Sequence, residues 1–383
     1  MLCSLISFEL KNAFFKLFRS NSLVQSFIFW KRAKKMIEKL KQNEELWDLF
    51  TKKEEYNLTF SDQYDRFPYY LSSQRDVFDP KVSRFMVENG LHPEYPDGKK
   101  FAVCLTHDID VVYPEELYPI VGTAKAFAKG NLTDAIKAPF SRINKKCNPC
   151  WNFKKIMELE AKYNAKSSFN FLALHPGEKD FNYKIEDLEA ELHFISDHGW
   201  EVGLHGGHES YKSFEDIMEK KRRLEKVLGK QVIGYRNHYL RFKVPDTWEL
   251  LSKAGFKYDT TFGYADCAGF RNGVCHPFRP FNRNTGKQID IIEIPLIIMD
   301  RTLLRDYMRL DVKKAWELIK RLIDKVEQYN GVVTILWHNN TSIDGQHLKY
   351  YEKFLEYVSG KKAWIASGEE VFNWWTTNVE KRC

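Results

Sequence analysis

Residues 101–110 read FAVCLTHDID, and this stretch decides the fold. Its first half is a short apolar run typical of a buried strand, and its second half ends in two aspartates. The chain then alternates between amphipathic segments and short apolar runs, beginning with a helix expected over 152–164 and a strand expected over 167–174. Strands that alternate with helices predict a parallel sheet with helices packed outside it, as in barrel-like or doubly wound α/β proteins.

The same alternation continues to the end of the chain, interrupted by a loop-rich insertion over about 262–286. We expect further strands over 200–204, 232–236, 289–297 and 331–338, and further helices over 184–199, 213–229, 244–255, 311–330, from Gly345 onward and over 369–375. Residues 1–95 lack the alternation and are rich in helix-forming patterns. We therefore predict two parts, a helix-rich N-terminal extension over 1–95 and an α/β catalytic domain over 96–383.

Composition excludes several classes of protein. A hydrophobic fraction of 43% with 29% charged residues is ordinary for a globular protein, and a net charge of +7 without a basic stripe argues against nucleic acid as the partner. The seven scattered cysteines favour a reducing compartment, and the charged N-terminus lacks a secretory signal, so we expect a cytoplasmic protein. Residues 14–40 mix aromatic with basic side chains, which is compatible with membrane-surface contact, but packing on the main domain is favoured.

The first strand presents two carboxylates together. Asp108 and Asp110 are two residues apart, so in an extended chain their side chains point to the same face. Two adjacent carboxylates repel each other unless a cation joins them, and the carboxyl end of a barrel strand is where such folds place their active sites. The pair indicates a metal site, although loop or helix-capping carboxylates would explain it equally well.

Polar side chains follow three further predicted strands. His205 follows the strand over 200–204, with His208 and Glu209 close behind it, and Arg236 and His238 lie at the end of the strand over 232–236. His338 ends the strand over 331–338. Because parallel strands bring their carboxyl ends to one edge of the sheet, we expect these groups to converge on one site, where imidazoles suit a divalent ion.

The motifs around Asp108, His205, Arg236 and His338 resemble, in order and spacing over roughly residues 101–375, those of the NodB-homology polysaccharide deacetylases. That family carries Thr-Phe-Asp-Asp, His-Ser/Thr-x-x-His, Arg-x-Pro-Tyr, an acidic motif and Leu-x-His. The resemblance implies a distorted (β/α) barrel. It also implies a metal-dependent hydrolase that removes an N-acetyl or similar acyl group from an amino sugar, polysaccharide or glycan precursor.

The family pattern also implies roles for individual residues. Asp108 corresponds to the general base, Asp110 and His205 to ligands of a divalent metal, zinc by default, and His338 to the general acid. Arg236 corresponds to the arginine that holds the base, and Tyr239 to the residue whose backbone N–H helps to form the oxyanion hole.

Two positions depart from the family pattern. The second metal-binding histidine falls on Glu209, with His208 one residue earlier, while His238 replaces the usual proline and is a third candidate. We expect His208 to complete the site, because neutral imidazole suits zinc and the preceding glycines let the turn bring it inward. For the acidic motif we favour Asp259 over Glu293.

Several alternatives stay open at this stage. The same scaffold could hydrolyse a non-sugar amide, or it could bind glycans without catalysis, against which the retention of Asp108 and His338 argues. Trp337 is either a wall for a sugar ring or, more commonly, a core side chain. Cys147 and Cys150 are interpreted as reduced thiols rather than as part of a zinc site.

Overall fold

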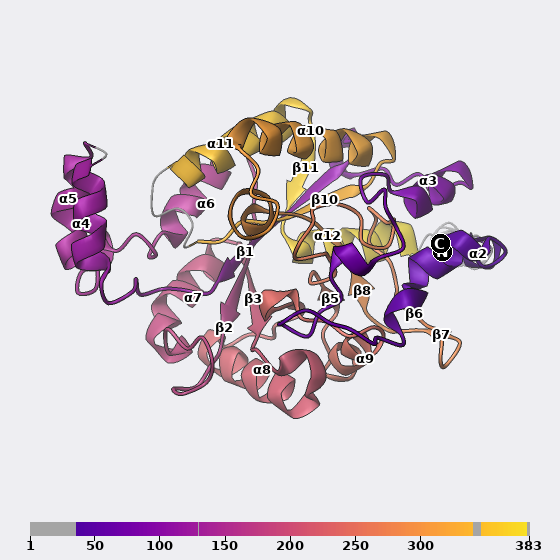
Figure 1. Ribbon diagram of the computed structural model, residues 1–383, viewed down its shortest axis with the longest axis horizontal. Helices are drawn as coiled ribbons and strands as arrows, with labels where there is room; N and C mark the ends of the chain where they lie inside the picture. Colours follow the sequence, from indigo (N-terminus) through magenta and orange to yellow (C-terminus); the bar gives the residue numbers. More distant parts are fainter. Residues whose placement is uncertain (1–35, 129, 340–345, 381–383) are drawn as a thin grey trace, which may run out of the picture.

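The computed structural model describes residues 36–128, 130–339 and 346–380, and its centre is a nine-stranded parallel sheet (Figure 1). The hydrogen-bonded order is β8-β5-β4-β3-β2-β1-β10-β9, with β11 also paired to β1. The strands are β1 Ala102–Ile109, β2 Ser168–Leu172, β3 Glu201–Gly206, β4 Gly234–Asn237, β5 Tyr258–Asp259, β8 Ile292–Glu293, β9 Leu296–Met299, β10 Val332–Leu336 and β11 Trp364–Ala366. Every pairing in this sheet is parallel, so the carboxyl ends of the strands lie on one side.

The sheet curls into a distorted barrel. Its first and last strands in the hydrogen-bonded order, β8 and β9, are separated in the chain by only Ile294 and Pro295, so the two edges must lie close together. The predicted single strand over 289–297 is thus two strands, because a proline has no N–H to donate to a ladder. The predicted fold class is confirmed.

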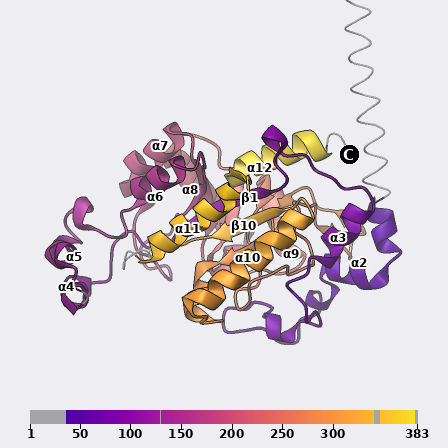
Figure 2. The same ribbon diagram turned by 90° about the horizontal axis from the view of Figure 1, so that it is seen from above.

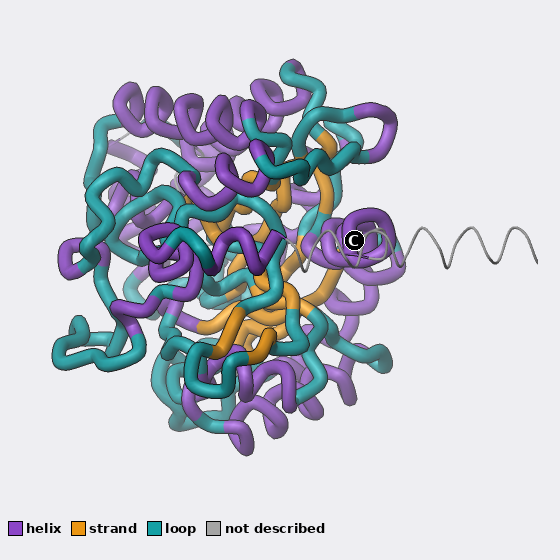
Figure 3. The backbone as a smooth tube through the Cα atoms, turned by 90° about the vertical axis from the view of Figure 1, so that its right-hand side faces the viewer, coloured by secondary structure: helices purple, strands orange, loops and turns teal. Residues whose placement is uncertain are grey.

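Helices surround the barrel, and the strands are therefore buried on both faces. Those covering it are α6 Phe153–Ala161, α7 Glu189–Asp197, α8 Phe214–Leu228, α9 Asp246–Lys253, α10 Val312–Gln328, α11 Gln346–Gly360 and α12 Gly368–Trp375. In the side view of Figure 3 the strands run through the middle of the molecule with helices and loops around them. All eight residues of β1 are buried, which explains why its first half, Ala102–Leu105, is a continuous apolar run rather than an alternating one.

The described part of the N-terminal region packs on the barrel domain. It contains α2 Glu44–Thr51 and α3 Lys81–Glu88, joined by turns and short 3-10 segments. The buried Arg271 guanidinium, in the insertion over 262–286, donates from Nε to Glu55 Oε1 at 3.0 Å, and the Phe270 N–H donates to the Val77 carbonyl at 2.7 Å. Residues of the described segment 36–95 thus contact the barrel domain. Most of the aromatic and basic stretch over 14–40 lies outside the described residues.

A helical hairpin projects from the barrel between β1 and α6. It consists of α4 Tyr118–Ala128 and α5 Leu132–Lys137, followed by a short 3-10 turn, and Figures 1 and 2 both show it standing away from the other helices. No sequence pattern predicts this hairpin. Among the described residues, none of the helices combines the length and apolar character that crossing a bilayer requires.

Candidate metal centre

A cavity of about 510 Å³ opens at the carboxyl ends of the strands. Side chains from several strand ends line it, among them Asp108, Asp110, His205, His238, Arg301 and His338. The parallel register explains this convergence, since His205 on β3 lies beside Arg236 on β4, and Asp108 on β1 lies beside Asn170 on β2. The expectation that separate strand ends deliver one set of polar groups agrees with this geometry.

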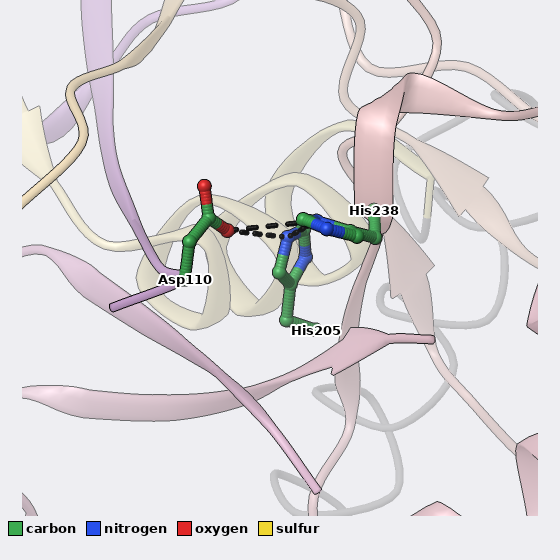
Figure 4. A group of neighbouring side chains, drawn as sticks. All are labelled: Asp110, His205 and His238. Carbon is green, nitrogen blue, oxygen red and sulfur yellow. Dashed lines mark hydrogen bonds and ion pairs between the residues drawn. The ribbon is translucent and has the colours of Figure 1, made fainter. Parts of the chain in front are cut away.

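Asp110, His205 and His238 form a group that we call the acceptor cluster (Figure 4). Their candidate ligand atoms all lie within 4.8 Å of one another. Asp110 Oδ1 is 3.2 Å from His205 Nε2 and 3.5 Å from His238 Nδ1, and the two nitrogens are 3.0 Å apart. Such a set of one carboxylate and two imidazoles is typical of a divalent-metal site.

The surroundings of the two histidines fix which nitrogen carries a proton. His205 Nδ1 lies 3.1 Å from the Arg236 carbonyl, which can only accept, so Nδ1 is the donor and Nε2 keeps its lone pair. His238 Nε2 lies 3.4 Å from Asp180 Oδ2, a carboxylate that favours a proton there and leaves the lone pair on Nδ1. Both lone pairs therefore point at the same space.

Asp110 completes this convergence of acceptors. Its Oδ1 is buried and accepts no hydrogen bond of good geometry. Burial opposes ionisation of Asp110, so a charged carboxylate at this position needs positive charge beside it. Three acceptor atoms with no hydrogen between them repel unless a cation lies among them, so these residues fit a bound divalent metal.

A second group, His338 with Asp300, faces the acceptor cluster across the cavity, and we call it the acid pair. Asp300 is fully buried, and its Oδ1 lies 2.7 Å from His338 Nδ1 while its Oδ2 accepts the His338 backbone N–H at 2.9 Å. Asp300 also lies 2.9 Å from His347 Nε2. Burial by itself lowers the pKa of His338, but the charge and hydrogen bond of Asp300 outweigh it and raise that pKa above its ordinary value. His338 Nε2 points into the cavity, 3.8 Å from Asp110 Oδ2.

Asp108 lies beside the acceptor cluster and is itself buried. Asn170 donates to its Oδ1 at 3.1 Å, and its Oδ2 is 3.7 Å from His205 Nε2. Asp108 does not belong to the acceptor cluster, so the two neighbouring aspartates have different surroundings, as the resemblance implied.

Arg236 contacts two threonines and not Asp108 itself. Its guanidinium donates to Thr106 Oγ1 at 2.8 Å and to Thr260 Oγ1 at 3.1 Å, while the expected contact with Asp108 is replaced by the one from Asn170. The positive charge of Arg236 is near Asp259, which accepts from the Thr261 N–H at 3.1 Å.

Asp259, the residue favoured for the acidic motif, neighbours Glu293 in the same buried region. Burial and the neighbouring Asp259 raise the pKa of Glu293 well above its ordinary value. Asp259 thus lies near the charge of Arg236, whereas the carboxylate that contacts the proposed acid His338 is Asp300.

His208 lies away from the acceptor cluster. Its Nδ1 is 2.8 Å from Glu209 Oε1 and its Nε2 is 2.9 Å from Lys179 Nζ, and Arg241 contacts it as well. The expectation that His208 completes the site therefore disagrees with this geometry. His238 occupies that place, because the short 3-10 turn over 238–240 directs its ring back toward β3.

Tyr239 forms a wall of the cavity together with the N-terminal region. Tyr239 and Leu240 have φ angles of 59° and 54°, a left-handed conformation that non-glycine residues adopt mainly where the surrounding structure enforces it. The Tyr239 ring stacks on that of Tyr64 with centroids 4.4 Å apart, and Arg66 Nη1 donates to the Tyr239 carbonyl at 2.6 Å. The N-terminal region, to which the sequence assigned no role, thus supplies part of the site.

Two weaker sequence features have structural explanations. Trp337 is buried and stacks on Tyr351 at 5.5 Å, so it belongs to the core and not to the cavity wall. Cys147 and Cys150 are free, and the described residues place no histidine or carboxylate with them in a metal-binding group.

Sequence reasoning missed Asp300, Asp180 and Asn170. Asp300 directly follows the apolar strand β9, the same signal that drew attention to the aspartates after β1, and it could have been found in this way. Asp180 lies in a loop after β2, far from any strand end, and its approach to His238 depends on the course of that loop.

Comparison with solved structures identifies the fold. A protein from Mycobacterium smegmatis named as a polysaccharide deacetylase matches with a TM-score of 0.50 at 18% identity, covering 74% of this chain and 93% of that one. The Puue allantoinase matches with a TM-score of 0.52 at 14% identity, covering 76% and 95%. A protein from Pseudomonas aeruginosa PAO1, also named as a polysaccharide deacetylase, matches with a TM-score of 0.52 at 13% identity, covering 76% and 96%.

No protein-family model and no curated protein matches the chain. The chain therefore has the fold that these polysaccharide deacetylase structures share. The resemblance noted in the sequence is confirmed for the fold.

Proposed function

We propose that the protein is a metal-dependent hydrolase that removes an N-acetyl or similar acyl group from an amino sugar or glycan. The observation that carries this proposal is the acceptor cluster, where lone pairs of Asp110, His205 and His238 converge without a hydrogen between them. His238 thereby replaces His208 as the proposed third ligand. Zinc suits one carboxylate and two imidazoles, and as a Lewis acid it would polarise an acyl carbonyl and make water more acidic.

Asp108 is the proposed general base. Asn170 donates to one of its oxygens, and the other oxygen lies at the edge of the acceptor cluster, facing the cavity. Asp108 takes a proton from the attacking water, whose oxygen then forms a bond to the acyl carbon. Arg236 acts as a positioning residue, because it bonds Thr106, two residues before Asp108 on the same strand.

His338 is the proposed general acid. The charge and hydrogen bond of Asp300 raise its pKa and so favour the protonated ring, and Asp300 holds Nδ1 so that Nε2 faces the cavity. When the bond between the acyl carbon and nitrogen breaks, His338 gives its proton to the departing amine, and Asp108 is left with the proton of the water. We propose that the Tyr239 backbone N–H stabilises the oxyanion, since the enforced turn at Tyr239 lines the same cavity.

The fold by itself leaves the acyl substrate open, because one structure that shares it is named as an allantoinase. A cavity of about 510 Å³ with an aromatic wall suits an amino-sugar unit, which favours a glycan. The test is to measure bound metal in the purified protein and then acetate release from N-acetylated sugar oligomers beside non-sugar amides. Metal binding with release from the sugars alone supports the proposal. Binding of metal without release from either class, or release from the non-sugar amides alone, contradicts it.

A further inference from the structure

The projecting helical hairpin carries most of the exposed large hydrophobic side chains among the described residues. We define the hairpin segment as residues 117–146, which contain α4, α5 and the turn that follows. Of the twelve exposed large hydrophobic side chains among the described residues, eight lie in this segment, namely Leu117, Ile120, Val121, Phe127, Leu132, Ile136, Phe140 and Ile143. Several are more than 60% exposed, and a cluster of this kind marks an interaction surface.

In the hairpin segment the small residues are buried and the large apolar residues are exposed, the reverse of the usual arrangement in a water-soluble helical hairpin. The residues buried where its helices meet are small, namely Gly122, Ala126, Ala135 and Ala138, while the large side chains face outward. A hairpin stabilised in water on its own would bury its large apolar side chains between the helices. Small residues at the helix contact with large apolar residues outside are typical of helices surrounded by lipid.

The charge of the hairpin segment narrows the choice of partner. The segment contains six Lys or Arg residues and one acidic residue, Asp134, and it stays basic when the preceding Glu115 and Glu116 are included. Lys125 and Lys137 are exposed on the same helices as the apolar side chains. Two copies of such a surface would repel each other, whereas an anionic lipid surface accepts both its charge and its apolar residues.

We propose that the hairpin segment docks on an anionic lipid surface by inserting its exposed apolar side chains among the acyl chains. This surface differs from the membrane contact weighed for the N-terminal stretch over 14–40. The segment begins only seven residues after Asp110, so docking would hold the cavity close to the lipid. This proposal does not depend on the catalytic activity.

The test is flotation of the full chain with vesicles of phosphatidylcholine alone and of phosphatidylcholine mixed with phosphatidylglycerol. The wild type is expected to float with the mixed vesicles, and less so as salt is raised. The triple variant Ile120→Asp, Phe127→Asp and Ile136→Asp is expected to bind them at least about 1,000-fold more weakly, since each inserted side chain contributes about tenfold or more.

The matched control adds the same three negative charges elsewhere. Phe60, Tyr70 and Val312 are also exposed apolar residues but lie outside the hairpin segment, and their substitution by aspartate is expected to leave flotation within a few-fold of the wild type. Thermal unfolding of both triple variants checks that each is folded. Equal flotation of the hairpin variant and the wild type overturns the proposal. So does a wild type that stays unbound and elutes at twice its mass, which would make a second copy the partner.

Discussion

The acceptor cluster and the acid pair contain the same kinds of side chain, and yet their protons are arranged in opposite ways. In the acceptor cluster, His205 Nδ1 faces a backbone carbonyl and His238 Nε2 lies 3.4 Å from a carboxylate, an arrangement that favours lone pairs turned toward Asp110. In the acid pair, Asp300 lies behind His338 and raises its pKa, which favours a protonated ring whose Nε2 faces the cavity. Whether an imidazole acts as a ligand or as an acid therefore depends on the group that its second ring nitrogen contacts and on the charges nearby.

The largest effect is expected from Asp108→Asn, which removes the proposed base beside the acceptor cluster. Turnover should fall by about 10²–10⁴-fold, the usual contribution of a general base, with bound metal unchanged. Steady-state kinetics beside metal analysis of the same preparation measures both quantities. Loss of metal together with activity would show that Asp108 belongs with the ligands and that the boundary of the acceptor cluster is misplaced.

The second-largest effect is expected from His238→Ala, which removes one of the three proposed metal ligands. Metal affinity should fall by more than about 100-fold, because even the loss of a group behind a ligand costs about 10- to 100-fold. The matched control is His208→Ala, which removes an imidazole outside the cluster and should keep its metal. Competition with a chromogenic chelator gives the two affinities. Should His208→Ala lose the metal and His238→Ala retain it, the geometric assignment of the third ligand fails.

A smaller effect is expected from Asp180→Asn, which leaves every acceptor atom in place. The carboxylate behind His238 would be lost, and metal affinity should fall by about 10- to 100-fold. Asp197→Asn is the control, since Asp197 is an exposed partner of Lys230. An affinity for Asp180→Asn equal to that of this control would mean that the proton on His238 is not held by Asp180.

Asp300→Asn should change the acid pair alone, and its main effect is on pH dependence. His338 must be protonated to act as an acid, so activity is present below its pKa and is lost as the pH rises through it. Asp300 raises this pKa, and removing its charge should therefore move the alkaline limb of the pH–rate profile to lower pH, with bound metal unchanged. A profile identical to that of the wild type would remove His338 from the role of acid.

Much of the fold and half of the site could be predicted from the sequence, for a physical reason. Asp108, Asp110, His205 and His338 each follow an apolar run, and parallel pairing brings all strand ends to one side without knowledge of the loops. The choice between His208 and His238 could not be predicted, because it depends on the direction of a turn with positive φ angles. Loop positions such as Asp180, and the projecting hairpin, likewise left no periodic signal in the sequence.

The buried ion pair between Glu55 and Arg271 affects how the protein unfolds. Both side chains are almost fully buried, and separating the N-terminal region from the barrel would leave Arg271 without its ion-pair partner and Glu55 with only Lys52 at 3.7 Å. We therefore expect the two regions to unfold in a single cooperative transition. A cut near residue 95, where the sequence suggests a boundary, would then produce two unstable fragments and not an independent catalytic module, and it would remove Tyr64 from the cavity wall.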